Sequence, residues 1–276
     1  MVRVSACKML VLIVFFGCGD DAEPAADTTV PDTTMPDTTE VSETATEVDA
    51  SGMTGDVDGR WAMLETQTAL VTTQLLGTQV QTSNSYYLAD LADGKMTVTL
   101  CDWLTEDASK LTTTRMGDQV LGSLGPFERG FTVAPTASGF DFTVASGVAL
   151  RGVTLTDPTS EEMPTESTDA RVIDQDGDDK PGITLIVQGT VNGALYVAHR
   201  HVAALDGELA SDTRISGLTD WTTEQIIFGS DPALISAQKP VAITHPDASL
   251  SHFVMVKVGA TDDCDAIKAQ RATLFP

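Results

Sequence analysis

Short runs rich in valine, threonine and leucine, separated by glycine, asparagine, aspartate and proline, extend from Arg60 to the end of the chain. The breaks recur about every ten residues, and helical spacing of apolar positions is nearly absent. This pattern is typical of an all-β protein, so we expect a single antiparallel domain, a β-barrel or a β-sandwich. The predicted strands are Arg60–Leu75, Gln79–Leu88, Lys95–Cys101, Gly130–Val133, Gly139–Val144, Val148–Leu155, Ile183–Gln188, Ala194–Ala203, Glu208–Ile215, Glu224–Phe228 and Phe253–Val258.

The strongest local signal in this pattern is a hairpin. Two apolar runs flank Asn192-Gly193, and an Asn-Gly pair readily adopts the positive φ angles of tight hairpin turns. The sequence therefore predicts a β-hairpin from Ile183 to Ala203.

Two segments are expected to be helical. Thr105–Lys110 is a possible helical turn, and Asp262–Ala272 is predicted to form a short C-terminal helix. Thr261 is placed to cap this helix, which has aspartates in its first turn and a lysine and an arginine in its last, as the helix dipole favours.

The first residues have the organisation of an export signal. Arg3 and Lys8 precede the apolar run Met9–Phe16, which is too short to cross a bilayer as a helix, and the run ends at Gly17-Cys18. These features resemble the lipobox of bacterial lipoproteins, although phenylalanines stand where a leucine and a small residue are usual. A plain secretory peptide or a short buried segment are the alternatives.

The lipobox resemblance implies a location and a membrane partner. It implies cleavage before Cys18 and acylation of that cysteine, and two or more acyl chains anchor a protein stably. Because Gly19 rather than aspartate follows the cysteine, the resemblance favours an envelope lipoprotein of the outer membrane, held there by lipid.

The next segment has the composition of a disordered tether. Residues 18–59 are acidic, contain no lysine or arginine, and repeat Asp-Thr-Thr at Asp27, Asp32 and Asp37. One-signed charge with little apolar surface predicts an extended linker, and the Thr/Pro content also permits O-glycosylation. We therefore divide the chain into a signal peptide (1–17), a lipidated tether (18–59) and a β-rich domain (60–276).

The charge of the chain limits its partners. Lysine and arginine number 16 against 40 aspartates and glutamates, which gives a net charge of −24. A surface this acidic repels phosphate backbones and anionic lipid head groups, so we expect no nucleic-acid partner. Divalent cations are the partners that such a field attracts.

Two of the four cysteines fall in the predicted domain. Cys101 and Cys264 are an even pair in a chain that we expect to be exported, where thiols oxidise. The sequence predicts a disulfide between an early strand and the final helix, with two free buried thiols as the alternative.

An aspartate-rich segment directly before the hairpin is the main candidate for chemistry. Asp174, Asp176 and Asp178 alternate, and Gly177 and Gly182 permit bends. A tight loop can direct three alternate carboxylates to one centre, which suits the oxygen-rich coordination of Ca²⁺. The segment resembles the start of EF-hand and thrombospondin type 3 calcium loops.

The calcium prediction assigns one further ligand from position and leaves others open. Lys180 would contribute its backbone carbonyl, while Glu166 or Asp169 are nearby in sequence. Asp179 and Leu185 stand where an EF-hand has its glycine and its bidentate glutamate, so a true EF-hand is excluded. We expect a weak, structural Ca²⁺ site, with a solvated acidic turn as the alternative.

His199 and His201 form the second candidate pair. Residues two apart on a strand project from one face, as metal-binding histidines do. A zinc hydrolase would need a third ligand, for which His245, His252 or an aspartate are possible. The alternative is two half-exposed strand histidines.

Other motifs do not point to catalysis. The sequence contains no G-x-S-x-G, no cysteine beside a plausible histidine and no phosphate-binding glycine loop after a strand. Gly59-Arg60-Trp61 resembles the G-x-W start of lipocalins, which implies a barrel that carries apolar ligands; plain core is the alternative role of Trp61. We therefore expect a non-enzymatic, calcium-stabilised binding or surface module, with a lipocalin-like carrier and a zinc hydrolase as alternatives.

The complete layout has a further resemblance. The lipobox, acidic tether, single domain, aspartate loop and lone cysteine pair look like the functionally uncharacterised surface lipoproteins of myxobacteria-type bacteria. This resemblance carries no known activity.

Overall fold

The computed structural model describes residues 53–74, 77–108, 112–238 and 240–276, and all of them belong to one compact unit. The predicted signal peptide, Cys18 and the tether up to residue 52 lie outside the described residues. None of the described helices has the length and apolar character needed to cross a membrane.

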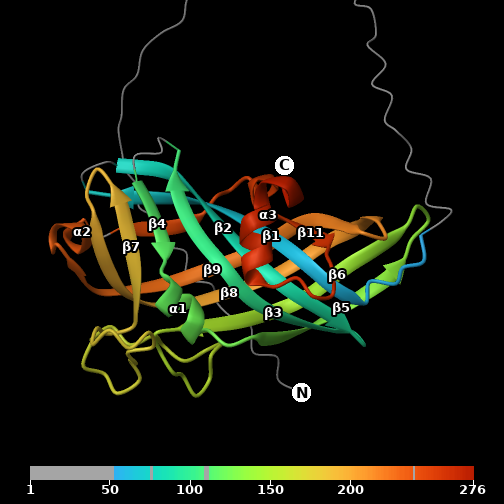
Figure 1. Cartoon of the computed structure of the whole chain (residues 1–276). Helices are drawn as coiled ribbons and strands as arrows, with labels where there is room; N and C mark the ends of the chain where they lie inside the picture. The colour runs from blue at the N-terminus through green and yellow to red at the C-terminus, as the bar shows by residue number, and fades with distance from the viewer. Residues whose placement is uncertain (1–52, 75–76, 109–111, 239) are drawn as a thin grey trace, which may run out of the picture. The chain divides into compact units, whose positions relative to one another are not determined.

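The described strands form one large antiparallel sheet, which confirms the expected all-β fold (Figure 1). Most are long and rich in residues that favour strands. They are β1 (Gly59–Thr73), β2 (Gly77–Ala92), β3 (Lys95–Asp107), β4 (Thr112–Met116), β5 (Phe127–Pro135), β6 (Phe140–Arg151), β7 (Ile183–Gly189), β8 (Gly193–Ser211), β9 (Arg214–Asp231), β10 (Val241–Thr244) and β11 (His252–Lys257).

The sheet closes on itself and forms a barrel rather than a sandwich. Starting at β1, each strand pairs with the next in the order β2, β3, β5, β6, β8, β9 and β11, and β11 pairs with β1 again. Closure leaves these eight strands with partners on both sides, so one face of each strand is directed into the barrel.

The two ends of the barrel have different walls. At one end, β5, β6 and β11 complete the ring, whereas at the other end β4 and β7 bridge from β3 to β8, and β10 replaces β11 beside β1. The long strands β1, β2, β3, β8 and β9 run through both halves. We call these the β5–β6 half and the β4–β7 half.

Two bulges reset which side chains face inward. In β3 the pairing with β2 shifts at Tyr86/Tyr87, which leaves Cys101 as the extra residue. In β6 the pairing with β8 shifts between Val144 and Gly147. An extra residue reverses the alternation of inward and outward side chains beyond it.

The predicted hairpin is confirmed, but its turn is longer than expected. Ile183 pairs with Val197, and Val187 pairs with Gly193. Gly193 is therefore already in β8, and because β7 extends to Gly189 the two strands are joined by residues 190–192; the Asn192 side chain accepts a hydrogen bond from the Gly189 N–H at 3.1 Å.

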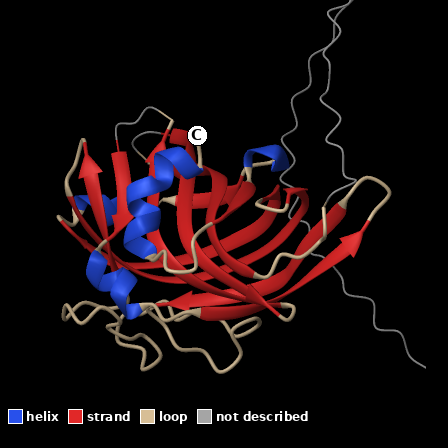
Figure 2. Cartoon of the chain, turned by 45° about the vertical axis from the view of Figure 1, so that its right-hand side comes forward, coloured by secondary structure: helices blue, strands red, loops and turns tan. Residues whose placement is uncertain are grey.

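Helices are short and lie outside the barrel (Figure 2). They are α1 (Asp118–Ser123), α2 (Leu234–Ala237), the 3-10 turn η2 (Ala248–Leu250) and α3 (Cys264–Leu274). The predicted C-terminal helix is present but begins at Cys264, and its cap is Asp263, whose carboxylate accepts a hydrogen bond from the Ala266 N–H at 2.9 Å. The expected cap at Thr261 was wrong.

Several other details of the strand prediction need correction. The helical turn expected at Thr105–Lys110 is wrong, because residues 105–107 continue β3 after the bulge; residues 109 and 110 lie outside the described part. The two strands expected at 139–144 and 148–155 are one bulged strand, β6. The sequence analysis missed the short strands β4 and β10 and the helix α1.

Helix α3 is fixed to the outer face of β2 and β3. Cys101 and Cys264 form the expected disulfide, with their Cα atoms 5.0 Å apart. Arg271 forms an ion pair with Asp102 at 3.1 Å, and the Phe275 ring lies 6.0 Å from the ring of Tyr86. Cys101, the extra residue of the β3 bulge, thus anchors helix α3 to the barrel wall.

We expect the disulfide to contribute substantially to stability. The bond closes a loop with a sequence separation of 163, and in the chain-entropy view such a crosslink contributes up to about 4–5 kcal/mol. Replacing both cysteines (Cys101→Ala with Cys264→Ala) should lower the free energy of unfolding in urea by that order. Reductant should destabilise the wild type and leave the double variant unchanged; equal unfolding curves with and without reductant in the wild type would contradict the crosslink.

Candidate functional site: a polar cavity inside the barrel

The inward side chains change character along the barrel axis. The β5–β6 half is filled by large apolar residues, among them Trp61, Met63, Phe142, Phe253 and Met255, each at most 1 % exposed. Continuing along β1 past Met63, the inward positions become Glu65 and Gln67, both buried. The apolar core is therefore a plug that ends at a polar layer.

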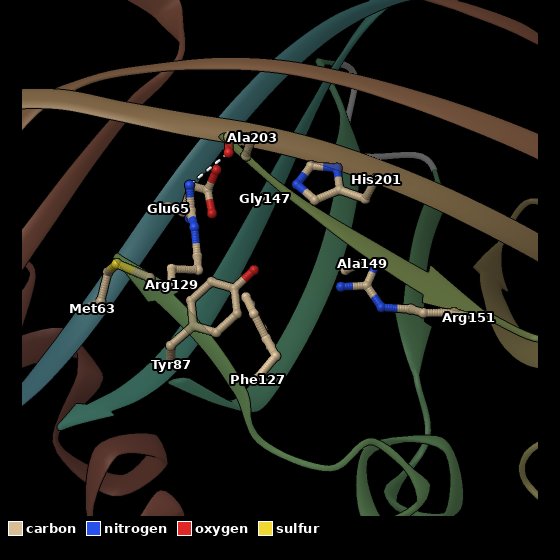
Figure 3. Close-up of a pocket in the computed structure, with 10 residues that line it drawn as sticks. All are labelled: Met63, Glu65, Tyr87, Phe127, Arg129, Gly147, Ala149, Arg151, His201 and Ala203. Atoms are coloured by element: carbon tan, nitrogen blue, oxygen red, sulfur yellow. Dashed lines mark hydrogen bonds between the residues drawn. The ribbon is translucent and has the colours of Figure 1, made fainter. Parts of the chain in front are cut away.

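Beyond this polar layer lies a large cavity in the β4–β7 half. It has a volume of about 470 Å³, within the range of about 300–1,000 Å³ typical of small-molecule sites. Its walls combine hydroxyl, amide and imidazole groups with the aromatic rings of Tyr87, Trp103 and Trp221. A second cavity of about 20 Å³, room for about one water molecule, adjoins the plug and shares Tyr87, Arg151 and His201 with the large one (Figure 3).

Arg151 enters this interior because of the β6 bulge. Before the bulge, Phe142 and Val144 face inward; after it, Gly147, Ala149 and Arg151 do. Arg151 is 7 % exposed and lines both cavities. Burial lowers the pKa of its guanidinium, which nonetheless keeps its charge at neutral pH because arginine starts above 12.

A second buried arginine, Arg129 of β5, is tied to the backbone. One terminal nitrogen donates hydrogen bonds to the carbonyl oxygens of Ala145, in the bulge, at 3.0 Å and of Ala203 at 2.6 Å. Gly147 makes room for it, since a Cβ there would lie 3.2 Å from Arg129 Nε. Arg129 thus has a structural role across β5, β6 and β8, although its Nε atom is buried without a hydrogen-bond partner.

Glu65 supplies the negative charge of the polar layer. It is 1 % exposed, and its Oε1 atom accepts hydrogen bonds from Gln67 Nε2 at 2.7 Å and Thr219 Oγ1 at 2.8 Å. Its charge opposes the lowering of the Arg129 pKa by burial. In Figure 3, Glu65 is drawn beside the guanidinium of Arg129, and Arg151 extends toward the cavity from another wall.

The two histidines face the cavity from β8, as their spacing predicted. His199 is 3 % exposed and bonds through Nε2 to Gln225 Oε1, while His201 Nδ1 lies 2.9 Å from Thr223 Oγ1. Burial, followed by the charge of Arg151, lowers the pKa of His199 to about 4 and that of His201 to about 3. Both imidazoles are therefore neutral at pH 7.

In the part of the chain that the structure describes, no third metal ligand joins these histidines. Among the described residues, the groups of three or more metal-binding side chains within mutual reach consist of the three aspartates alone. His201 Nε2 instead lies 3.2 Å from Gln67 Nε2. The neighbouring positive charge of Arg151 also opposes a cation at this position.

The aspartate segment belongs to the long connection between β6 and β7, on the outside of the barrel (Figure 2). Asp174, Asp176 and Asp178 each offer a carboxylate oxygen, and these oxygens lie within 4.8 Å of one another. Such a group could hold a metal ion. Gly177 and Gly182 have φ angles of 72° and 92°, as expected of residues that permit the bends.

Hydrogen bonds already shape this loop. Asp174 Oδ1 accepts from the Gly177 N–H at 2.8 Å, and Asp178 Oδ2 accepts from Thr184 Oγ1 at 2.6 Å. Asp176 differs, because its Oδ1 atom is buried without a hydrogen-bond partner, and burial raises the pKa of this carboxyl. An unpaired buried carboxylate oxygen is costly unless a cation or a proton compensates it.

The sequence suggested further calcium ligands, Lys180 and Glu166 or Asp169, and none of them is among the three grouped carboxylates. Lys180 is in the same loop, with its N–H donating to Asp178 Oδ1 at 2.9 Å and its ammonium 5.7 Å from the ring centroid of Tyr196. Asp169 binds Arg171 through both carboxylate oxygens. The role of the Lys180 carbonyl as a ligand stays a prediction.

No known family model matches the chain, and no curated protein is significantly similar to it. The site must therefore be interpreted from its own geometry.

Sequence reasoning found the histidines and the aspartates but missed the other polar residues of the interior. Glu65 and Gln67 share the alternation of Trp61 and Met63 on β1, which is the signal that could have placed them inside. For Arg151 the alternation is misleading, because the bulge reverses it.

The burial of His199 predicts a loss of stability in acid. In the unfolded chain a histidine binds its proton near pH 6.5, whereas the folded protein resists protonation down to about pH 4. The unfolded state therefore binds more protons than the folded state within this window. The contribution of neutral His199 to the free energy of unfolding is complete above pH 6.5 and falls by about 3 kcal/mol as the pH drops to 4. Urea unfolding at pH 7 and at pH 4 measures this change in the free energy of unfolding.

Two variants separate the effect of His199 on the pH dependence of stability from the effect of the many carboxylates. His199→Gln, which keeps a polar group facing Gln225, should show a smaller drop in stability between the two pH values than the wild type. His252→Gln, at an exposed position of β11, should behave like the wild type. Parallel pH profiles for all three proteins would contradict a buried neutral His199.

Proposed function

We propose that this protein is a non-enzymatic binding module that holds a small organic molecule inside its barrel. The observation that carries the proposal is the cavity of about 470 Å³ in the β4–β7 half. A barrel interior of eight strands is normally filled by side chains or holds one small ligand. Here the β4–β7 half keeps a cavity beside its packed side chains.

The chemistry of the lining favours binding over catalysis. Aromatic rings provide apolar contact area, while Gln67, His199, His201 and Gln225 can fix the orientation of polar groups. The histidines are held by neutral partners, Gln225 and Thr223, rather than by a carboxylate that would orient and activate them as general bases. The mixed lining also suits an amphipathic ligand better than the wholly apolar one expected of a lipocalin-like carrier.

We further propose that the module is displayed at the cell envelope. The support is the sequence: a basic start, a short apolar run, Cys18 as an acylated first residue, and an acidic linker with the composition of a spacer. This arrangement would attach the barrel to the outer membrane by lipid alone and leave the ligand-binding domain free of the bilayer.

Calcium is the ion that we propose for the aspartate loop. Three clustered carboxylates and the unpaired buried Oδ1 of Asp176 support a cation with oxygen ligands. The loop reaches β7 through the bond between the Thr184 N–H and Asp176 Oδ2 at 3.0 Å. An ion here would have a structural role, fixing the long β6–β7 connection against the strands that follow it.

Filling the cavity should abolish binding without unfolding the barrel. Ala69 of β1 lines the large cavity, so Ala69→Phe places a ring in the space that the ligand would occupy. Thermal-shift and calorimetric titrations with neutral, anionic and cationic aromatic compounds should show binding to the wild type, weakened at least tenfold in the variant.

The matched control for this substitution is Ala134→Phe, which adds the same ring at an exposed position of β5. It should bind like the wild type. Retention of binding by Ala69→Phe, or an absence of binding by the wild type to all of these compounds, would contradict the proposed function.

Calcium should stabilise the folded protein. A site with a dissociation constant of about 10⁻⁴ to 10⁻³ M, typical of extracellular modules, gives about 1–3 kcal/mol at 10 mM Ca²⁺. Asp176→Asn should lose this stabilisation, whereas Asp141→Asn, at an exposed position of β6, should keep it. Urea unfolding with Ca²⁺, Mg²⁺ or chelator provides the measurement, and equal stability in Ca²⁺ and chelator would overturn the assignment.

A further inference from the structure

The residues that line the two cavities carry one positive charge that no negative charge among them balances. Among the residues that line the two cavities, Arg129 and Arg151 face one buried carboxylate, Glu65, and the two histidines are neutral at pH 7; Asp107, also buried on β3, lines neither cavity. Glu224, at the rim of the large cavity, is already paired with Arg200, whose Nε lies 3.1 Å from its carboxylate. The lining of the two cavities is therefore cationic within a chain of net charge −24.

The uncompensated charge is that of Arg151. Arg129 is bonded to two backbone carbonyls, while the charge of Glu65 acts on both Arg129 and Arg151. By contrast, no residue in the described part of the chain accepts a hydrogen bond from the Arg151 guanidinium, although this side chain is only 7 % exposed. A guanidinium carries five N–H donors, and Arg151 lines both cavities.

Such an arrangement is unfavourable in the free protein. A buried charge is normally paired, because its removal from water costs several kcal/mol. The fold nonetheless places Arg151 here through a bulge, whereas an unbulged β6 would direct it outward. Water in the cavity offsets part of the cost, and a bound anion would offset more, since the guanidinium fork matches a carboxylate in two parallel hydrogen bonds.

We propose that the cavity binds an organic monoanion, whose carboxylate pairs with Arg151 and whose ring or apolar body lies beside Trp103 and Trp221. This inference rests on the proposed small-molecule function and specifies the ligand class. A single negative charge balances the walls, whereas the dianion of a phosphate ester would leave one negative charge buried. The indole of Trp221 is held in place for such a contact by its Nε1–H bond to Ser251 Oγ at 2.9 Å.

The geometry around Arg151 adds neutral groups that would complete the recognition. His201 and Tyr87 line the small cavity together with Arg151 (Figure 3). Burial raises the pKa of Tyr87 to about 12, so its hydroxyl stays protonated and can donate to an anion. These neutral donors add no charge to the net single positive charge of Arg129, Arg151 and Glu65, which line the same cavity.

The test compares carboxylates with uncharged molecules of the same shape. Phenylacetate and hexanoate, their amides phenylacetamide and hexanamide, and phenyl phosphate are titrated calorimetrically into the purified full-length protein at pH 7 in a buffer without chloride. Each carboxylate should bind at least tenfold more tightly than its amide and than phenyl phosphate, since a charge-assisted bond contributes about that factor.

Three variants locate the effect. Arg151→Met, which keeps an unbranched side chain but removes the guanidinium, should bind carboxylate and amide equally; Arg151→Lys should retain part of the discrimination. Arg115→Met removes a positive charge at an exposed position of β4 and should leave the discrimination at the wild-type value. The thermal midpoint of ligand-free Arg151→Met should match or exceed that of the wild type, because the unpaired charge is gone.

The remaining outcomes separate this inference from the function on which it rests. Equal binding of carboxylates and amides by the wild type, or discrimination that survives in Arg151→Met, would overturn the anion proposal and leave small-molecule binding intact. Sodium chloride is titrated separately, and binding of chloride with none of the organic compounds would mean an adventitious ion only and overturn both. A large fall in the midpoint of Arg151→Met would show a structural role for Arg151 and overturn the proposal as well.

Discussion

Closure of the sheet is the constraint on which the rest of this structure depends. Because eight strands each have partners on both sides, every second residue along them is directed into one shared interior. That interior must be filled, or lined by groups that tolerate a cavity. Rings and methionines fill the β5–β6 half, while the other half surrounds a cavity lined by hydroxyls, amides and imidazoles together with aromatic and aliphatic side chains. The same strands therefore provide a stabilising plug and a hollow chamber.

The two bulges allow one sequence to meet both demands. In β3, the extra residue Cys101 lies where it can bond to α3, and Trp103 is then directed toward the cavity. In β6, the shift after Val144 frees a carbonyl for Arg129 and brings Arg151 inside. The single extra residue in β6 thus determines both how β6 pairs with β8 and that the charge of Arg151 lies inside the barrel.

The features that the sequence predicted are those encoded locally. Asn192-Gly193 marked the hairpin, the acidic and basic ends marked the C-terminal helix, and an even cysteine pair marked the crosslink. Inward direction after a bulge depends instead on the partner strand, so Arg151 had no readable signal. Short strands such as β4 are likewise determined by the neighbours that pair with them. Of the proposed ligand site, the two histidines with their shared face were therefore predictable, whereas Arg151 and the aromatic walls were not.

The contrast between the acidic chain and its cationic interior bears on how a ligand would be held. Charges on the outer surface are screened over about 10 Å at 0.1 M salt, whereas a charge inside the barrel is screened far less. Once an anion has entered, the local field of Arg151 therefore outweighs the distant carboxylates. The neutral state of His199 and His201 matters for the same reason: protonation of either would add positive charge beside Arg151, and the low pKa values keep that from happening at neutral pH. The interior thus presents one fixed charge over a wide range of conditions, and selectivity for a singly charged ligand follows from that constancy.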